Sequence, residues 1–231
     1  RIIYGIRLHR DGVDRFQWRD RYSMDDGQME LVTPGVHGTA GNKEEVATAL
    51  ASYLRGTFHF GDFTFTPGIR HERIHFESFD YGASDLERLG EAEYRSNDVS
   101  VLLPGLGLNY NVSTLFDVFT GIHRGFIPPG SNPETSPELS INMELGFRFS
   151  QRYSSAQLVL FSNNYSNLLG ADLNASGGSG SGELFNGGSA IAKGLEFEFS
   201  IDPFMGGPFH HLSMPIRVAY TYTDASFSNT F

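Results

Sequence analysis

The sequence of 231 residues carries a formal net charge of -10 at pH 7 and contains no cysteine. The acidic balance argues against a nucleic-acid partner, because a phosphate backbone requires a basic surface. The lack of cysteine excludes disulfide scaffolds, cysteine-ligated zinc and thiol catalysis. With 27 glycines, 20 phenylalanines and 10 tyrosines, the composition predicts many strands joined by turns, with little helix.

The chain has no apolar run that approaches the ~18 residues of a transmembrane helix. Its most apolar short stretch, Val101 to Leu108, is interrupted by Pro104 and by glycines. The start at Arg1 lacks the basic, apolar and small-residue regions of a signal peptide. We therefore expect a chain that is mature, truncated or not exported, and we favour truncation.

Segments with strand patterning recur from one end of the chain to the other. Each is near the ~10 residues that a tilted membrane strand requires, whereas soluble strands average nearer ~5 to 6 residues. Closed bacterial barrels have an even strand number, so a total of about nine predicts only part of a barrel. In chain order the predicted strands cover Ile2 to His9, Val46 to Phe60, Phe63 to Phe76, Asp98 to Asn111, Leu115 to Phe126, Ser140 to Ser150, Ala156 to Tyr165, Ile191 to Ile201 and Pro215 to Thr223.

Three of these segments alternate cleanly with a period of two. In Ser140 to Ser150, the apolar side chains of Ile141, Met143, Leu145, Phe147 and Phe149 share one face, and Glu144 and Arg148 lie on the other. The segments Ile191 to Ile201 and Pro215 to Thr223 repeat the pattern, except that Lys193 falls on the apolar face near a strand end, where it can reach the interface. Such alternation predicts strands with one apolar and one wet face.

The connections distinguish a membrane barrel from a sandwich, whose sheets also have one apolar face. Short turns at Gly61-Asp62, Asn111 to Ser113 and Gln151 to Tyr153 alternate with long polar segments. This is the arrangement of outer-membrane barrels, with short periplasmic turns and long extracellular loops. Asp202 to Ser213 is longer than its short-rim position predicts. The long segments are Arg10 to Glu45, Glu77 to Asn97, Ile127 to Glu138 and Ser166 to Ser189.

Phenylalanines gather at the predicted short-turn rim, as in the aromatic girdle at a membrane interface. They are Phe58, Phe60, Phe63, Phe65, Phe147, Phe149, Phe197 and Phe199. The terminal Phe231 is an aromatic of the kind that often ends such barrels. Because the last predicted strand runs away from the short-turn rim, we nevertheless expect an internal segment.

Charged residues in the strand centres all fall on the polar faces. A basic side chain that faces lipid at the bilayer midplane costs about 2 to 4 kcal/mol, so these residues should face the lumen. We expect most of them to pair with one another or with a plug. They are Arg70, Glu72, Glu144, Arg148, Glu196, Glu198 and Arg217.

No pattern of residues supports catalysis, a metal site or a cofactor, so we expect a protein that is not an enzyme. The glycine cluster Ser176 to Gly182 lacks the Lys-Ser or Lys-Thr pair of a phosphate loop and is typical of a flexible loop. The acidic residues Asp85, Glu87, Glu91 and Glu93 fit a solvated loop. The histidines, including His71, His75, His123 and His210-His211, lack zinc-ligand spacing.

Three stretches resemble TonB-dependent outer-membrane receptors, especially the group similar to the ferric citrate transporter. The first is Thr66 to Glu72, in which His71 replaces the usual aromatic residue. The second and most specific runs from Leu103 to Tyr110 and then from Gly121 to Gly130, with Arg-Gly-Phe followed by Pro-Pro at a strand-to-loop junction. The third links Asn163 to Leu169, Asn186 to Gly188 and Lys193 to Glu196. The motif residues are Gly68, Arg70, Arg124, Gly125, Phe126, Pro128 and Pro129.

The resemblance implies an all-β antiparallel transmembrane barrel of about 22 strands, closed by a plug. Residues 1–231 would then form one partial barrel domain without the plug and the remaining strands. The implied protein is a multi-pass receptor in the outer membrane of a Gram-negative bacterium. It would contact outer-membrane lipid, bind a ferric chelate or siderophore as cargo, and take energy from the TonB complex through a TonB box, without covalent chemistry.

Charge complementarity to an anionic chelate selects four candidate ligand-binding residues: Arg70, His123, Arg124 and Arg148. We expect them at the lumen or the rim. Two alternatives stay open. One is a soluble extracellular β-sandwich that binds carbohydrate, with Trp18 and loop tyrosines as stacking surfaces, and the other is a passive porin-like channel.

Overall fold

The computed structural model describes residues 1–171, 184–205 and 212–228. Nine strands form one antiparallel sheet in which each strand pairs with the next along the chain. β5 (Phe58–Phe60) continues β4 beyond Thr57 and pairs with β6. The nine strands are β1 (Ile2–Gln17), β4 (Gly41–Gly56), β6 (Phe63–Asp80), β7 (Glu93–Asn111), β8 (Phe116–Ile127), β9 (Glu138–Gln151), β10 (Ser154–Ser166), β13 (Ser189–Ile201) and β14 (Ile216–Phe227).

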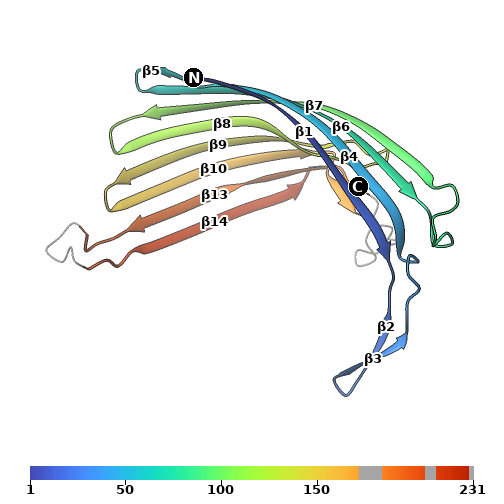
Figure 1. Ribbon diagram of the computed structural model, residues 1–231. Helices are drawn as coiled ribbons and strands as arrows, with labels where there is room; N and C mark the ends of the chain where they lie inside the picture. The colour runs from blue at the N-terminus through green and yellow to red at the C-terminus, as the bar shows by residue number, and fades with distance from the viewer. Residues whose placement is uncertain (172–183, 206–211, 229–231) are drawn as a thin grey trace.

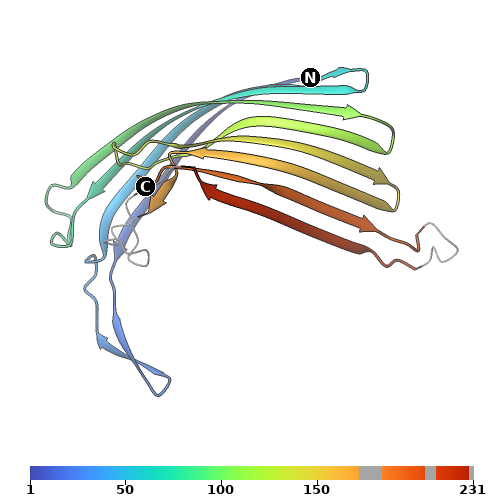
Figure 2. The ribbon, with the colours of Figure 1, turned by 180° about the vertical axis from the view of Figure 1, so that it is seen from behind.

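The sheet curls into a trough that is part of a barrel wall, with β1 and β14 as its edges (Figures 1 and 2). The predicted antiparallel barrel segment of about nine strands is therefore confirmed. The alternative of a β-sandwich is wrong, because the described residues contain no second sheet packed against the first. In the same residues, no helix is long and apolar enough to cross a membrane.

The strands extend further than the sequence pattern predicts, with lengths of 12 to 19 residues. The segment Arg10 to Glu45 is not one loop. It contains the outer half of β1, the hairpin β2 (Arg21–Asp25) to β3 (Gln28–Thr33), and the start of β4. Likewise the predicted loop Glu77 to Asn97 contains the end of β6, up to Asp80, and the start of β7, from Glu93. Backbone pairing continues where both faces become polar, so the hydrophobic period of two disappears before the strand ends.

The two rims differ as predicted. The turns after β5, β7 and β9 are short and lie at one end of the trough, whereas the long connections and the β2–β3 hairpin lie at the other (Figure 1). The longer turn after β13 is organised by Asp202. Its carboxylate accepts hydrogen bonds from the Ser213 hydroxyl at 2.7 Å and from the backbone N–H of Phe204 at 3.2 Å. The predicted glycine loop Ser176 to Gly182, His210-His211 and Phe231 lie outside the described residues.

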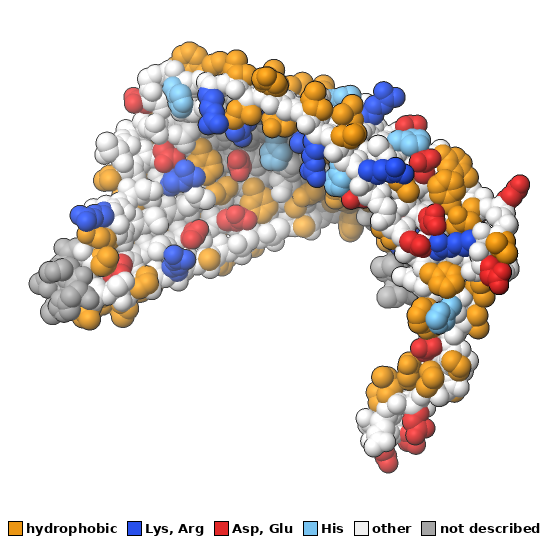
Figure 3. All heavy atoms as spheres, viewed as in Figure 1, with side chains coloured by type: hydrophobic (Ala, Val, Ile, Leu, Met, Phe, Trp, Pro, Cys, Tyr) orange, Lys and Arg blue, Asp and Glu red, His pale blue; other side chains and the backbone are white. Residues whose placement is uncertain are grey.

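The strand register assigns every side chain to one of two faces. On the outer, convex face, one row joins Thr120, Leu145, Leu160, Leu195 and Tyr222 across five strands. All seven charged residues that were predicted to face the lumen lie on the concave face. Figure 3, which looks into the trough, shows acidic and basic side chains on its wall. Lys193 is on the convex face as predicted, where it pairs with Asp224 at 3.8 Å.

The aromatic girdle is present on the convex face near the short turns. Ring pairs join Phe63 to Tyr110 with centroids 4.4 Å apart and Phe116 to Phe149 at 6.1 Å. Phe58 and Phe65 form a further pair at 6.5 Å. Such pairs add stabilisation beyond simple area burial.

Large side chains on the concave face lie flat over glycines of the neighbouring strand. The ring of Phe161 covers Gly194, and the ring of Phe119 covers Gly146. A β-carbon on either glycine would collide with the ring that covers it. Glycine inside a strand marks such close approach. These two rings therefore lie along the wall instead of projecting into the trough.

We expect Gly194→Ala to lower the free energy of unfolding of the full-length protein by about 1 to 3 kcal/mol, the usual cost of overpacking. The new methyl would collide with the backbone carbonyl of Tyr222 and lie 2.8 Å from the Phe161 ring. Urea titration in detergent micelles measures the change. Gly107→Ala is the matched control, since its methyl would lie 3.8 Å from Thr66. Equal effects of the two substitutions would contradict the packing described for Gly194.

Candidate functional site

A row of small and polar residues crosses the concave face at mid-height. The register aligns Gly68, Gly105, His123, Asn142 and Asn163 on five successive strands. The His123 Nε2 and Asn142 Nδ2 atoms are 3.2 Å apart, within hydrogen-bonding distance. Beside this row is an open hollow of about 480 Å³, lined by His123, Asn142, Glu144, Phe161, Asn163 and Glu196 among others. The hollow offers hydrogen-bond donors and acceptors on a wall that a partner or ligand can approach.

Arg70 and Arg148 both lie on the concave face, as predicted, but each is already paired. Arg70 forms an ion pair with Glu72 on the same strand. Arg148 donates from Nε to the Gln157 side chain at 3.0 Å and pairs with Asp117 at 3.5 Å. Its guanidinium also lies 4.9 Å from the centre of the Phe119 ring. These contacts hold both arginines against the wall and offset their charge.

Arg124 does not join these residues: of the two predicted places, the lumen or the rim, the lumen is wrong, and Arg124 lies three residues before the long-rim end of β8. Adjacent residues of a strand point to opposite faces, so His123 and Arg124 cannot both face the trough. Arg124 shares the convex face with its register partner Ile141. Its Nη1 donates to the Leu102 carbonyl of β7 at 3.4 Å. Pairing between β7 and β8 ends at Gly105 and His123, next to Pro104, which has no N–H to continue it.

The Pro-Pro motif begins a connection that folds over the concave face. Pro129 is fully buried. The Asn97 side-chain amide of β7 lies below the connection and donates to three of its carbonyl groups. The acceptors are Gly130 at 3.2 Å, Asn132 at 2.9 Å and Thr135 at 3.3 Å. The predicted position of Pro128 and Pro129 at a strand-to-loop junction is confirmed, and Asn97 fixes the shape of that junction.

Two further motif residues have different roles in the packing. A β-carbon at Gly125 would lie 2.7 Å from the Ser140 hydroxyl, so glycine makes room for that side chain. Phe126 reaches the small core cluster of Ile74, Val99 and Val101. At Gly68 a β-carbon would make only ordinary contact with Arg55 at 3.8 Å, and nothing in the structure explains why this residue is glycine.

The β8–β9 and β10–β13 connections interlock at the long rim. The Thr135 hydroxyl donates to the Leu184 carbonyl at 3.0 Å. The Asn186 side chain accepts from the Ser136 N–H at 2.8 Å and donates to the Ser136 carbonyl at 3.0 Å. The buried carboxylate of Glu138 accepts from the Leu169 N–H at 2.9 Å. Together with the short hairpin of β11 (Leu169–Ala171) and β12 (Leu184–Asn186), these bonds form a loop platform above the trough.

A narrow cleft of about 100 Å³ separates the loop platform from the sheet wall. The wall side carries Lys43, Glu45, Asp80, Glu93 and Arg95, and Pro129 to Asn132 form the other side. Lys43 and Glu45 pair at 3.0 Å, and Arg95 and Glu93 pair at 2.8 Å. The cleft thus presents both charges to a polar ligand. No group of three or more potential metal ligands occurs in the described part of the chain.

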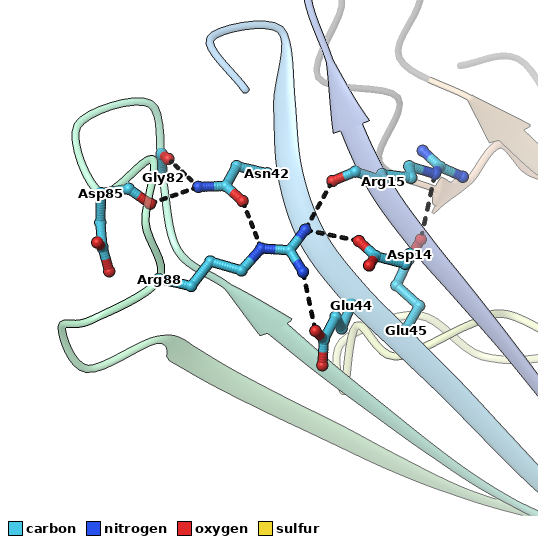
Figure 4. Close-up of polar contacts among 8 residues, drawn as sticks. All are labelled: Asp14, Arg15, Asn42, Glu44, Glu45, Gly82, Asp85 and Arg88. Carbon is cyan, nitrogen blue, oxygen red and sulfur yellow. Dashed lines mark hydrogen bonds and ion pairs between the residues drawn. The ribbon is translucent and has the colours of Figure 1, made fainter. Parts of the chain in front are cut away.

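Arg88 links the β6–β7 connection to the long-rim ends of β1 and β4 (Figure 4). Its guanidinium donates to Asn42 and Glu44, each at 2.8 Å, and to Asp14 at 2.6 Å. The hydrogen bond to Asp14 raises the pKa of Arg88, which stays a cation at every physiological pH. Arg88 was not singled out from the sequence. The available signal was one basic residue within an otherwise acidic connection, at Tyr81 to Ala92.

The profile of the TonB dependent receptor-like β-barrel family matches residues 3–230. The chain belongs to this family. Barrels of TonB-dependent receptors are outer-membrane proteins of Gram-negative bacteria, and they are receptors for transport, not enzymes. Membership also argues against the alternative of a passive porin-like channel. No curated protein matches the sequence.

Solved structures of the family share the fold. The ferric citrate transporter FecA in its unliganded form superposes with a TM-score of 0.71 at 19% identity, covering 98% of this chain and 32% of FecA. The ferric-catecholate import receptor Fiu from E. coli gives 0.66 at 14% identity, covering 99% and 35%. The ferric yersiniabactin uptake receptor FyuA from Yersinia pestis gives 0.64 at 19%, covering 99% and 33%. The chain thus spans about a third of the length of these receptors.

We expect Asn97→Asp to loosen the loop platform of the receptor. The substitution turns an amide donor into a carboxylate that faces three carbonyl oxygens, and unmet polar groups of this kind cost about 1 to 3 kcal/mol. Backbone amides of residues 128–137 in the full-length protein should exchange at least about fivefold faster by hydrogen–deuterium exchange mass spectrometry. Asn109→Asp on the same strand is the control, because within the described residues the Asn109 side chain bonds only to that of Asn111, at 3.0 Å. Unchanged exchange in Asn97→Asp would contradict the role given to this amide.

Proposed function

We propose that this chain forms part of the wall of an outer-membrane receptor that takes up a ferric chelate or siderophore and is energised through TonB. The observation that carries the proposal is the family match over residues 3–230. Three solved relatives of the same fold are named for ferric citrate, ferric catecholate and ferric yersiniabactin. The proposed full-length protein adds a plug, a TonB box and the strands that close the barrel.

The geometry of the concave face supports a binding role. The loop platform overhangs the trough on the long rim, where cargo would enter from outside. Below it, the cleft and the mid-height row of His123, Asn142 and Asn163 present polar groups at two depths. Uptake then requires binding and release, with no covalent step.

Among the four candidate ligand-binding residues, the proposal retains Arg70, His123 and Arg148. Because Glu72 and Asp117 offset the two arginines, these residues would act as oriented hydrogen-bond donors more than as net positive charge. His123 is the most accessible of the three, since it is exposed beside the open hollow. It is therefore the first residue to test.

The test is uptake of radiolabelled iron by cells that lack other ferric-chelate receptors and express the full-length protein. Ferric citrate and a ferric catecholate are supplied separately, with and without functional TonB. We expect at least one chelate to be taken up, and uptake to disappear without TonB. Uptake of neither chelate, or uptake that survives the loss of TonB, would overturn the proposal.

A pair of substitutions at neighbouring positions locates the binding face. His123→Ala should raise the apparent KM for uptake about two- to tenfold, the effect of one lost hydrogen bond. Arg124→Gln should leave the KM unchanged, because Arg124 points to the convex face. A larger effect of Arg124→Gln than of His123→Ala would show that cargo does not contact this part of the concave face.

A further inference from the structure

The convex face carries an apolar belt that starts at the short-turn rim. On β6 the outward side chains are Phe63, Phe65, Pro67 and Ile69, and on β1 they are Ile2, Tyr4, Ile6 and Leu8. The next outward residues are mostly polar and of mixed charge, with Leu50 opposite Arg73 and Asp98 opposite His75. We call this group the outward polar patch, formed by Arg10, Thr48, Ser52, His71, Arg73 and Ser100.

The strand register makes the outward polar patch continuous across four neighbouring strands. Arg10 pairs with Thr48, and Ser52 pairs with His71. Arg73 pairs with Ser100 on β7. The His71 Nε2 and Ser100 Oγ atoms are 3.0 Å apart. Two guanidinium groups, an imidazole and three hydroxyls therefore face the same side of the wall.

The height of Arg73 above the girdle matches the edge of a bilayer. Arg73 is ten residues along β6 from Phe63. With a rise of about 3.3 Å per residue and a tilt of about 40°, that distance is about 25 Å along the membrane normal, the height of the apolar band of outer-membrane barrels. The patch lies towards the long connections, which are extracellular in this family. Arg73 therefore reaches the headgroup level of the outer leaflet.

Within the described residues, Arg73 is a cation with no ion-pair partner. Neither Arg10 nor Arg73 has an ion pair or a side-chain hydrogen bond within the described residues. Two acids share the face of Arg73 on β6 and β7, and each has another partner: Asp98 is bound by His75 Nδ1 at 3.0 Å, and Glu77 by the Tyr94 hydroxyl at 3.2 Å. β6 is flanked by β4 and β7, so no additional strand can cover Arg73 from the side. Its partner must approach from outside the wall.

We propose that the outward polar patch binds the phosphate headgroup of an outer-leaflet lipid. The planar guanidinium of Arg73 can bind two phosphate oxygens at once, and the neighbouring hydroxyls and His71 can donate to the others. The apolar side chains that adjoin the patch accept the acyl chains: Leu50 lies opposite Arg73 and Leu8 opposite Leu50, and Ile69 lies nearer the short-turn rim on β6. This continuity of apolar and cationic surface fits a lipid and not a free anion. The site is independent of the transported cargo.

The experiment measures lipid retention on the full-length protein by native mass spectrometry from detergent micelles. Phosphatidylglycerol and phosphatidylcholine are the probes, titrated separately, with inorganic phosphate as competitor. We expect phosphatidylglycerol to bind more tightly than phosphatidylcholine, and Arg73→Gln to weaken phosphatidylglycerol binding about tenfold. Arg73→Lys keeps the positive charge but loses the two-point contact, so its binding should be intermediate between that of the unchanged protein and that of Arg73→Gln. Arg55→Gln, the same charge change on the exposed concave face, should have no effect.

Each alternative outcome overturns the proposal in a distinct way. Equal binding of the two lipids would show that the net negative charge of the headgroup is not recognised. Full competition by millimolar inorganic phosphate would identify a free-anion site. Equal loss in Arg73→Gln and Arg55→Gln would assign the effect to net charge and not to the patch. If Arg73→Gln fails to fold, Arg10→Gln provides the same comparison at the other end of the patch.

Discussion

A wall that stands in hydrocarbon must pair nearly all of its backbone N–H and carbonyl groups, because no water is available to satisfy them. In this chain an uninterrupted antiparallel ladder from β1 to β14 meets that requirement. The ladder also forces successive side chains to opposite faces, and the two faces consequently differ throughout. Edge strands β1 and β14 retain free backbone groups in the described sheet, and further strands would have to pair with them in a closed barrel.

Two basic residues on the concave face are held in local ion pairs, which offset their charge. Arg70 with Glu72 and Arg148 with Asp117 show this arrangement. At the long rim, the connections are held in place by contacts of single side chains and not by backbone pairing between strands. Asn97 and Asn186 bind backbone groups of the connections, and Arg88 joins the β6–β7 connection to two strands. The shape of the connections at the long rim thus depends on side-chain hydrogen bonds, whereas the shape of the wall depends on backbone pairing.

The sequence was sufficient to predict the strands, their faces and the two rims, since each depends on the local alternation of apolar and polar residues. Glu144, Glu196 and Arg217 were assigned correctly to the concave face for that reason. Strand ends were predicted poorly, because alternation fades where β6 and β7 leave the apolar belt although their pairing continues to Asp80 and Glu93. Arg124 was grouped with His123 by charge alone, without counting their opposite parity, which turns Arg124 to the convex face. Asn97, Asn186 and Arg88 act through contacts distant in sequence, which no local pattern contains.

The central claim is that the convex face contacts lipid and the concave face contacts water. Spin labels attached one at a time along β9 of the full-length receptor in a bilayer test it most directly. Substitutions Met143→Cys, Glu144→Cys, Leu145→Cys and Gly146→Cys can each carry a label, and the sequence has no other cysteine. The account predicts that spin labels at positions 143 and 145 are relaxed mainly by oxygen dissolved in the lipid. Labels at positions 144 and 146 should be relaxed mainly by a water-soluble nickel chelate. Similar accessibility at all four positions would contradict it.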